Sequence, residues 1–222
     1  MTTTKYVLFD LDGLLIDSER VYTEVTNEIL LPYGKKFNWT LKANMMGKHE
    51  RVACEYLVNA LQIPLTVDEY IAQRNAKQNE AWPRLALRPG ALELVTHLKA
   101  HNIPIAVATG SRKSSLMQKC NAPVVHHLMS LFGENCVTAD DDVNGVSSPS
   151  KENLLARDSC LVFEDAVPGV QAGLNGNMKV IWVPEPELLD LYKDDDSVKG
   201  VYQTLTSLQD LKLSDFGLPD IK

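Results

Sequence analysis

Tyr6-Val7-Leu8-Phe9-Asp10-Leu11-Asp12-Gly13 is the stretch of this sequence that decides the fold, an apolar run that ends in two aspartates and a glycine. The run is too short for a helix and indicates a buried strand. Because side chains alternate along a strand, Asp10 and Asp12 are expected to point the same way, close enough to share a cation or to divide the roles of nucleophile and acid/base. Gly13 then permits a turn that a side chain would obstruct. The alternative is an acidic turn after an edge strand.

Short apolar runs recur later in the chain, at residues 103–108, 160–163 and 178–183. Each precedes or follows a helical pattern, and its hydrophobicity is continuous, which is typical of strands covered on both faces. We therefore expect an α/β fold whose core is a Rossmann-like parallel sheet. Ligands of such sheets bind beyond the carboxyl ends of the strands, which is where Asp10 and Asp12 fall.

A helical insertion is expected between the first two strands, because roughly ninety residues separate them and a usual crossover needs only a dozen or so. The interval contains helical patterns at residues 19–31, 51–61 and 66–82. In the second of these, Val52, Tyr56 and Leu57 are spaced to share one face. We expect an all-helical cap domain of residues 18–87, inserted into a core domain of residues 1–17 and 88–222.

Two later strand ends also carry polar residues suited to chemistry. Residues 103–112 contain an apolar run followed by Thr109-Gly110-Ser111. A helix N-terminus and a hydroxyl group there could hold a phosphoryl group. The alternative is that Thr109 or Ser111 only caps the helix. Residues 161–165 run from an apolar strand into Glu164-Asp165, and such hard oxygen ligands suit Mg²⁺.

These strings resemble the motifs of the haloacid-dehalogenase superfamily. Asp10-Leu-Asp-Gly-Leu-Leu-Ile-Asp-Ser-Glu19 resembles its DxDGxxxDSE opening, and Phe163-Glu-Asp-Ala-Val-Pro-Gly169 resembles its magnesium motif. The resemblance implies a phosphatase in which Asp10 attacks phosphorus and forms an aspartyl phosphate. Asp12 would protonate the leaving oxygen and later activate water.

The same resemblance implies a site for Mg²⁺ and one for phosphate. The metal would be held by Asp10, Asp165, the backbone carbonyl of Asp12 and Glu164 through water. Thr109 would act on the phosphoryl group, with Gly110 and Ser111 beside it.

Weaker strings resemble the eukaryotic pseudouridine-5'-phosphatase subgroup. They are Met46-Gly47-Lys48, Arg88-Pro-Gly90, Ser207-Leu-Gln-Asp-Leu211 and Phe216-Gly-Leu-Pro219. Pseudouridine 5'-phosphate is therefore the first candidate substrate, followed by sugar phosphates and other nucleotides. Gly47 and Lys48 are expected to contact substrate; the alternative for Lys48 is an exposed surface lysine.

The sequence departs from the superfamily at its lysine motif, GKPxPD, which is absent. Lys151 is the only lysine of residues 140–157 and lies 13 residues before Glu164, roughly half the family spacing. It is the candidate for the missing catalytic lysine, and an exposed lysine on a short helix is the alternative. Because losing a phosphate-binding lysine slows such enzymes by orders of magnitude, a non-catalytic relative that binds metal and phosphate remains open. A phosphosugar mutase, which would share the same acids, is a third reading.

Composition narrows the classes of partner. The 222 residues are 45% hydrophobic and carry a net charge of -7, without a basic block, which argues against a nucleic-acid or anionic membrane partner. A small phosphorylated metabolite is the expected partner, and no obligate protein partner is evident. The amino terminus lacks a signal-peptide pattern and no stretch is long enough to span a membrane, so a cytoplasmic location is expected. The cysteines, Cys54, Cys120, Cys136 and Cys160, are expected to be small apolar side chains of the core.

Overall fold

The computed structural model describes residues 4–46, 48–141 and 157–221. Within these residues the core is one parallel sheet of six strands in the order β3-β2-β1-β4-β5-β6. The strands are β1 (Tyr6–Phe9), β2 (Ile105–Ala108), β3 (Cys136–Val137), β4 (Cys160–Glu164), β5 (Lys179–Trp182) and β6 (Gln203–Thr204). The predicted α/β fold with a Rossmann-like parallel sheet is confirmed.

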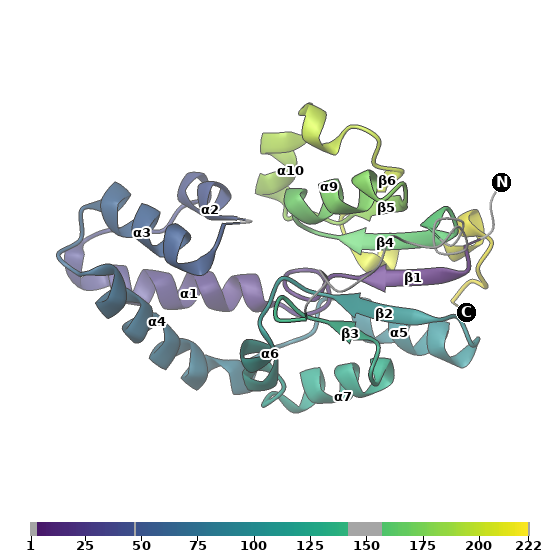
Figure 1. Ribbon diagram of the computed structural model, residues 1–222, viewed down its shortest axis with the longest axis horizontal. Helices are drawn as coiled ribbons and strands as arrows, with labels where there is room; N and C mark the ends of the chain where they lie inside the picture. The colour runs from purple at the N-terminus through teal and green to yellow at the C-terminus, as the bar shows by residue number, and fades with distance from the viewer. Residues whose placement is uncertain (1–3, 47, 142–156, 222) are drawn as a thin grey trace.

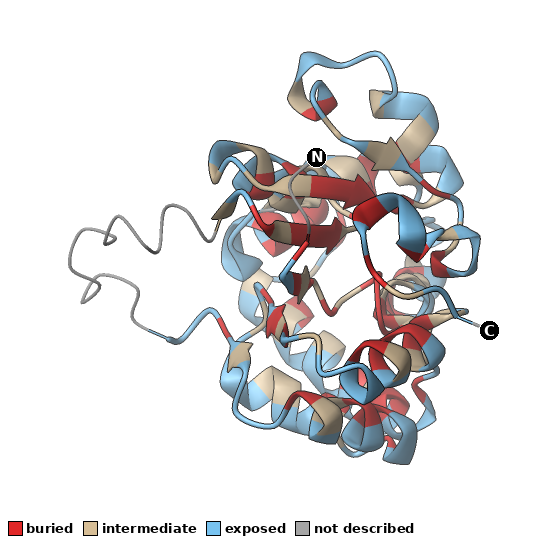
Figure 2. Cartoon of the chain, turned by 90° about the vertical axis from the view of Figure 1, so that its right-hand side faces the viewer, coloured by how far each residue is buried: buried red, intermediate tan, exposed pale blue. Residues whose placement is uncertain are grey.

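Helices cover both faces of the sheet (Figure 1). Alternate side chains of β4, such as Leu161 and Phe163, belong to a large apolar cluster that includes α5 (Ala91–Ala100) and α7 (Pro123–Phe132). Val162, on the opposite face, packs in a second cluster with α9 (Val167–Asn175) and α10 (Pro186–Tyr192). Figure 2 shows the buried residues concentrated along the strands and on the helix faces turned toward them. Burial on both faces explains the continuous hydrophobicity of the strand sequences.

Strand β1 lies in the middle of the sheet, and its register sets the site. Phe9 is the parallel partner of Val107 on one side and of Phe163 on the other. The Phe9 and Phe163 rings stack with centroids 5.1 Å apart. Because parallel strands end at the same edge, the residues that follow β1, β2 and β4 meet there.

The described part of residues 18–84, between β1 and β2, folds into helices and short connections and is here called the helical segment. Its helices are α1 (Ser18–Leu30), α2 (Trp39–Met45), α3 (Glu50–Leu61) and α4 (Val67–Ala81), with the short turns η1 (Leu31–Tyr33) and η2 (Trp82–Arg84). This helical segment lies beyond the carboxyl ends of the strands (Figure 1). Thr66 begins α4 with a capping box, in which its hydroxyl accepts from the Glu69 amide and the Glu69 carboxylate accepts from the Thr66 amide. The division into a cap at residues 18–87 and a core stays a prediction.

The residues expected to share one face of α3 are buried to different degrees. Leu57 is buried, Tyr56 is half-buried against the core, and Val52 is 52% exposed. Helix α3 packs between α2 and α4, and its other buried residues are Ala53, Cys54 and Val58.

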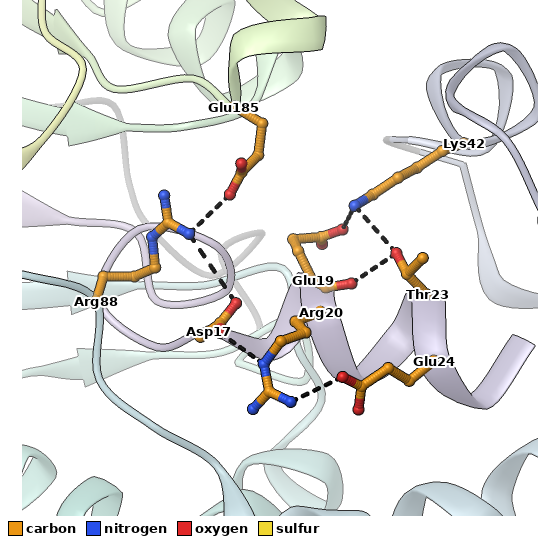
Figure 3. A network of polar contacts seen from close by, with 8 residues as sticks. All are labelled: Asp17, Glu19, Arg20, Thr23, Glu24, Lys42, Arg88 and Glu185. Atoms are coloured by element: carbon orange, nitrogen blue, oxygen red, sulfur yellow. Dashed lines mark hydrogen bonds and ion pairs between the residues drawn. The ribbon is translucent and has the colours of Figure 1, made fainter.

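The two chain crossings between core and helical segment run side by side. Ile16 pairs with Leu87 as an antiparallel bridge, and the Asp17 amide donates to the Ala86 carbonyl at 2.9 Å. In Figure 3 the Arg88 guanidinium lies 2.8 Å from the Glu185 carboxylate and 4.0 Å from that of Asp17. The helical segment is thus joined to the sheet by a short paired ribbon braced by ion pairs.

The remaining elements are α6 (Lys113–Lys119), after β2, and three turns near the carboxyl terminus: η4 (Asp196–Val198), η5 (Leu208–Asp210) and η6 (Leu213–Phe216). None of the helices in the described ranges has the length and apolar character needed to cross a membrane.

Candidate active site

Three carboxylates meet at the carboxyl edge of the sheet. Asp10 follows β1, Glu164 ends β4, and Asp165 comes next in the chain. Each offers a carboxylate oxygen, and the three oxygens lie within 4.8 Å of one another. The Asp10 amide donates to the Phe163 carbonyl at 3.0 Å, which extends the β1 to β4 ladder as far as these acids. The structure therefore brings together three of the predicted metal-binding side chains, here called the acidic cluster.

Burial and mutual repulsion perturb this acidic cluster. Burial, and then the charges of Glu164, Asp165 and Asp12, raise the pKa of Asp10 well above its ordinary value. Asp165 is affected in the same direction, first by burial and then by Glu19. Burial raises the pKa of Glu164 to about 7, although hydrogen bonds from the Ala166 and Asp165 amides oppose the shift. A bound cation would relieve the repulsion between these groups.

The surroundings of Asp165 fit a metal ion. Its Oδ1 atom is buried and accepts no hydrogen bond from the described residues. Leaving a buried carboxylate oxygen unsatisfied is costly, and a cation would compensate it. The Trp182 indole donates to the Asp165 backbone carbonyl at 2.8 Å, which holds this residue in place. Hard oxygen ligands at this spacing suit Mg²⁺.

Gly13 makes room for Asp165. Its φ of +87° lies in the left-handed region, and a Cβ atom there would lie 2.9 Å from Asp165 Cγ, closer than real side chains approach. The turn predicted at Gly13 therefore has two causes: the backbone conformation and the carboxylate packed against it.

Asp12 lies apart from the acidic cluster. Its two carboxylate oxygens are 2.6 and 2.7 Å from the Lys119 ammonium, and the Ser111 hydroxyl donates to Oδ2 at 2.7 Å. Burial raises the pKa of the Asp12 carboxyl, but the charge and hydrogen bonds of Lys119 outweigh burial and bring it below its ordinary value. With its side chain engaged in this way, Asp12 has only its backbone carbonyl for the predicted metal contact, which stays a prediction.

Lys119 is the site residue that sequence reasoning missed. It ends α6, and its side chain is fully buried. Burial lowers its pKa, but Asp12 and then Tyr22 more than reverse that effect. The stretch Lys113-Ser-Ser-Leu-Met-Gln-Lys119 reads as a polar surface helix. The hydrophobic pattern of this stretch does not distinguish Lys119 from the exposed residues around it. The one signal for it in the sequence is its position in the helix that directly follows Thr109.

The phosphate-binding candidates after β2 lie beside this pair. The buried Thr109 accepts a hydrogen bond on Oγ1 from the Ser111 amide at 3.1 Å and so shapes the turn before α6. The N-cap of α6 is Arg112, without a side-chain cap bond, so the alternative that Thr109 or Ser111 caps the helix is wrong. Its hydroxyl proton remains available to a phosphoryl oxygen. Gly110 is exposed, and a Cβ atom there would meet nothing within 4 Å. The Lys113 amide at the start of α6 already donates to the Asp140 carboxylate at 2.8 Å.

Of the other predicted site residues, the structure describes Lys48. Lys48 is exposed, and its ammonium lies 4.9 Å from the centre of the Tyr56 ring, in α3. Gly47 and Lys151 lie outside the described residues.

A small pocket separates the helical segment from the core near the acidic cluster. Its volume is about 90 Å³, and it lies between α2 and the helices α9 and α10. It is lined by Ala43, Met46, Val167, Pro168, Leu188 and Tyr192. In the same region Lys42 of α2 forms an ion pair with Glu19 at 2.8 Å (Figure 3). Val167 follows Asp165 by two residues, so the pocket adjoins the carboxyl end of β4.

Comparison with known proteins places this geometry in a family. The sequence profile of haloacid dehalogenase-like hydrolases matches residues 7–183. The (DL)-glycerol-3-phosphatase 2 of Arabidopsis thaliana is 35% identical, over 96% of this chain and 91% of its own. A probable pseudouridine-5'-phosphatase of Drosophila melanogaster is 34% identical, over 96% and 94%.

A solved structure agrees in fold. The crystal structure of a HAD family hydrolase from Deinococcus radiodurans R1, with bound phosphate and sodium, aligns with a TM-score of 0.73 over 98% of both chains at 24% identity. The profile match and the two relatives show that this chain belongs to the haloacid dehalogenase-like hydrolases and is a phosphatase.

Proposed function

We propose that this phosphatase is a magnesium-dependent phosphomonoester hydrolase that acts on a small phosphorylated metabolite through an aspartyl phosphate on Asp10. The observation that carries the proposal is the acidic cluster itself. Three carboxylates meet, those of Asp10 and Glu164 half-buried and that of Asp165 buried, and a buried oxygen of Asp165 has no partner among the described residues. Such a cluster is stable in its charged form only with a metal ion.

In the proposed reaction, Asp10 forms a bond to phosphorus as the bond to the leaving oxygen breaks. Because Lys119 keeps the pKa of Asp12 low, the Asp12 carboxylate would take up the proton of a substrate phosphate monoanion and give it to that oxygen. Water then attacks phosphorus and loses a proton to Asp12, the bond from phosphorus to Asp10 breaks, and inorganic phosphate leaves. Mg²⁺ held by Asp10, Asp165, the Asp12 carbonyl and Glu164 would supply positive charge that offsets repulsion between Asp10 and the phosphate.

The phosphoryl group is proposed to lie at the end of β2. The Thr109 hydroxyl would donate to a phosphoryl oxygen, with the exposed Gly110 leaving space for the group's approach. Ser111 would act indirectly, because its hydroxyl already donates to Asp12.

Pseudouridine 5'-phosphate is proposed as the first substrate and glycerol 3-phosphate as the second. The names of the Drosophila and Arabidopsis relatives, which are about equally similar to this chain, support both. The four cysteines are unpaired, which supports a reducing compartment such as the cytosol.

The test is phosphate release from pseudouridine 5'-phosphate, uridine 5'-phosphate, glycerol 3-phosphate and several sugar phosphates, with and without Mg²⁺. Asp10→Asn removes the nucleophile, and Asp196→Asn, on the exposed turn η4, is the matched control. Circular dichroism establishes that each variant is folded.

We expect Mg²⁺-dependent turnover that Asp196→Asn retains and Asp10→Asn abolishes. Rapid quenching of the wild type with labelled substrate should trap a phosphoprotein that hydroxylamine cleaves, as an acyl phosphate requires. Folded wild type without turnover on any substrate would overturn the proposal and favour a binding protein. A sugar bisphosphate among the products would point instead to a mutase.

A further inference from the structure

We infer that Lys119 is a positioning residue that holds the Asp12 carboxylate apart from the acidic cluster, in the orientation from which it serves the leaving group. The inference rests on the proposed function, because it presupposes that Asp12 is the acid of the first step. It adds a residue outside the family motifs, carried by a helix that the sequence presents as a polar surface element.

The Lys119 ammonium has an acceptor for each of its protons. Nζ lies 2.6 and 2.7 Å from the two Asp12 carboxylate oxygens and 2.7 Å from the Ser111 hydroxyl oxygen. An ammonium has three protons, and these three acceptors, with the Tyr22 side chain as a further partner, leave none directed elsewhere. The Ser111 hydroxyl donates a hydrogen bond to Asp12 Oδ2 at 2.7 Å. Asp12 is thus clamped on both oxygens, which leaves its carboxylate little freedom to rotate.

Because its protons already have acceptors within the protein, Lys119 differs from a lysine that binds phosphate. A lysine that bridges phosphoryl oxygens needs protons directed at the phosphate, whereas Lys119 could offer one only by releasing Asp12 or Ser111. The short hydrogen bonds of its ammonium within the described residues go to Asp12 and Ser111. The structure therefore places the buried cation on Asp12, and its effect on the reaction passes through that side chain.

The helical segment covers Lys119. Its Nζ lies 5.7 Å from the centre of the Tyr22 ring in α1 and 5.6 Å from that of Trp82 in η2. The two rings contact each other edge to face, with centroids 5.5 Å apart. Tyr22 lies just after the first chain crossing and Trp82 just before the second. These aromatic residues cover the ammonium, whose side chain is fully buried, whereas the Asp12 side chain is 18% exposed.

A buried ion pair is weak grounds for a stabilising role, because desolvation offsets most of its attraction. We therefore assign the ion pair the role of orienting the Asp12 carboxylate. Carboxylate oxygens of Asp10, Glu164 and Asp165 already lie within 4.8 Å of one another, and a fourth free carboxylate two residues from Asp10 would add to their repulsion. With its own counterion, Asp12 can lie beside the cluster without joining it.

The test compares leaving groups. Glycerol 3-phosphate expels an alkoxide that needs a proton, whereas p-nitrophenyl phosphate expels a stable phenolate that does not. The ratio kcat/KM reports the steps up to loss of the leaving group, so it is independent of the later attack by water. Lys119→Met removes the ammonium at similar length, and Lys113→Met, exposed on the same helix, is the control.

For Lys119→Met we expect kcat/KM to fall about 100-fold or more with glycerol 3-phosphate but less than about tenfold with p-nitrophenyl phosphate. Lys113→Met should match the wild type with both. A double-mutant cycle with Asp12→Asn gives a second readout, since Asp12→Asn/Lys119→Met leaves no unpaired buried charge. If Lys119 acts through Asp12, adding Lys119→Met to Asp12→Asn should change kcat/KM by less than about threefold.

Equal losses with both substrates, or losses that multiply fully in the double mutant, would overturn the inference. A wild type inactive with both would refute the proposed function instead. The inference would then be decided by the crystal structure of Lys119→Met, which requires no turnover. An Asp12 carboxylate that still contacts the Ser111 hydroxyl there would overturn it, and one that has turned away would support it.

Discussion

Replacing Gly13 with alanine should separate backbone strain from damage to the metal site. The new Cβ would lie 2.9 Å from Asp165 Cγ. Carbon atoms pack at about 3.5–4.0 Å, so the carboxylate would have to retreat by about 1 Å. Mg²⁺ requires oxygen ligands at about 2.0–2.1 Å in near-ideal geometry and does not tolerate such a displacement. A misplacement of about 1 Å at a reacting centre costs about 100-fold in rate.

The matched control is Gly34→Ala. Gly34 has a φ of +64°, and a Cβ there would meet nothing within 4 Å. Both substitutions place alanine in the left-handed region and should cost about 1–2 kcal/mol of unfolding free energy in urea. Only Gly13→Ala should also lower kcat/KM for p-nitrophenyl phosphate by about 100-fold and raise the Mg²⁺ concentration needed for half-maximal activity. If Gly13→Ala kept kcat/KM within about threefold of Gly34→Ala, the argument from close packing against Asp165 would be wrong.

Three further outcomes follow from the structure. The pKa of Glu164 is raised to about 7, above its value in the unfolded chain. The metal-free protein therefore loses stability as the pH rises from the unfolded pKa to about 7. Mg²⁺ binds the deprotonated acids and stabilises the folded state more at the higher pH. The rise in Tm caused by Mg²⁺ should therefore be larger at about pH 8 than at about pH 6, and an equal rise would contradict the assignment. Thr66→Ala removes the capping box with Glu69 and should lower the unfolding free energy in urea by about 1 kcal/mol, with kcat unchanged; a loss of kcat would show that α4 is coupled to the chemistry. Trp182→Phe leaves the Asp165 carbonyl without its indole donor and should cost about 1–3 kcal/mol and weaken Mg²⁺ binding by calorimetry, whereas unchanged binding would exclude a role in holding that residue.

The long periodic elements could be predicted from the sequence, and the short ones could not. Helix α1 was predicted at residues 19–31, and it spans Ser18–Leu30. Helices α2 and α10 were not predicted, and each has only 7 residues. Two turns are too few for an apolar face to repeat, so their sequences look like loops. Packing against neighbouring elements stabilises them in the fold.

The acidic cluster was also within reach of the sequence, for a topological reason. Asp10 and Glu164 lie far apart in the chain, yet each follows a buried apolar run, and parallel strands end at one edge. The neighbours of Lys48 could not be predicted in this way. Its neighbourhood depends on how the helical segment packs, and the structure pairs it with the Tyr56 ring.

The sequence by itself determined the parallel sheet, the helical insertion and the carboxylates at the strand ends, because these follow from local hydrophobic runs and from the geometry of parallel strands. Tertiary structure alone decided which acid receives a counterion. Lys119 is fully buried against Asp12 beneath Tyr22 and Trp82, contacts that join three regions distant in the chain. The burial of a lysine and the choice of its partner depend on these long-range contacts, which leave no periodic trace in the residues around it.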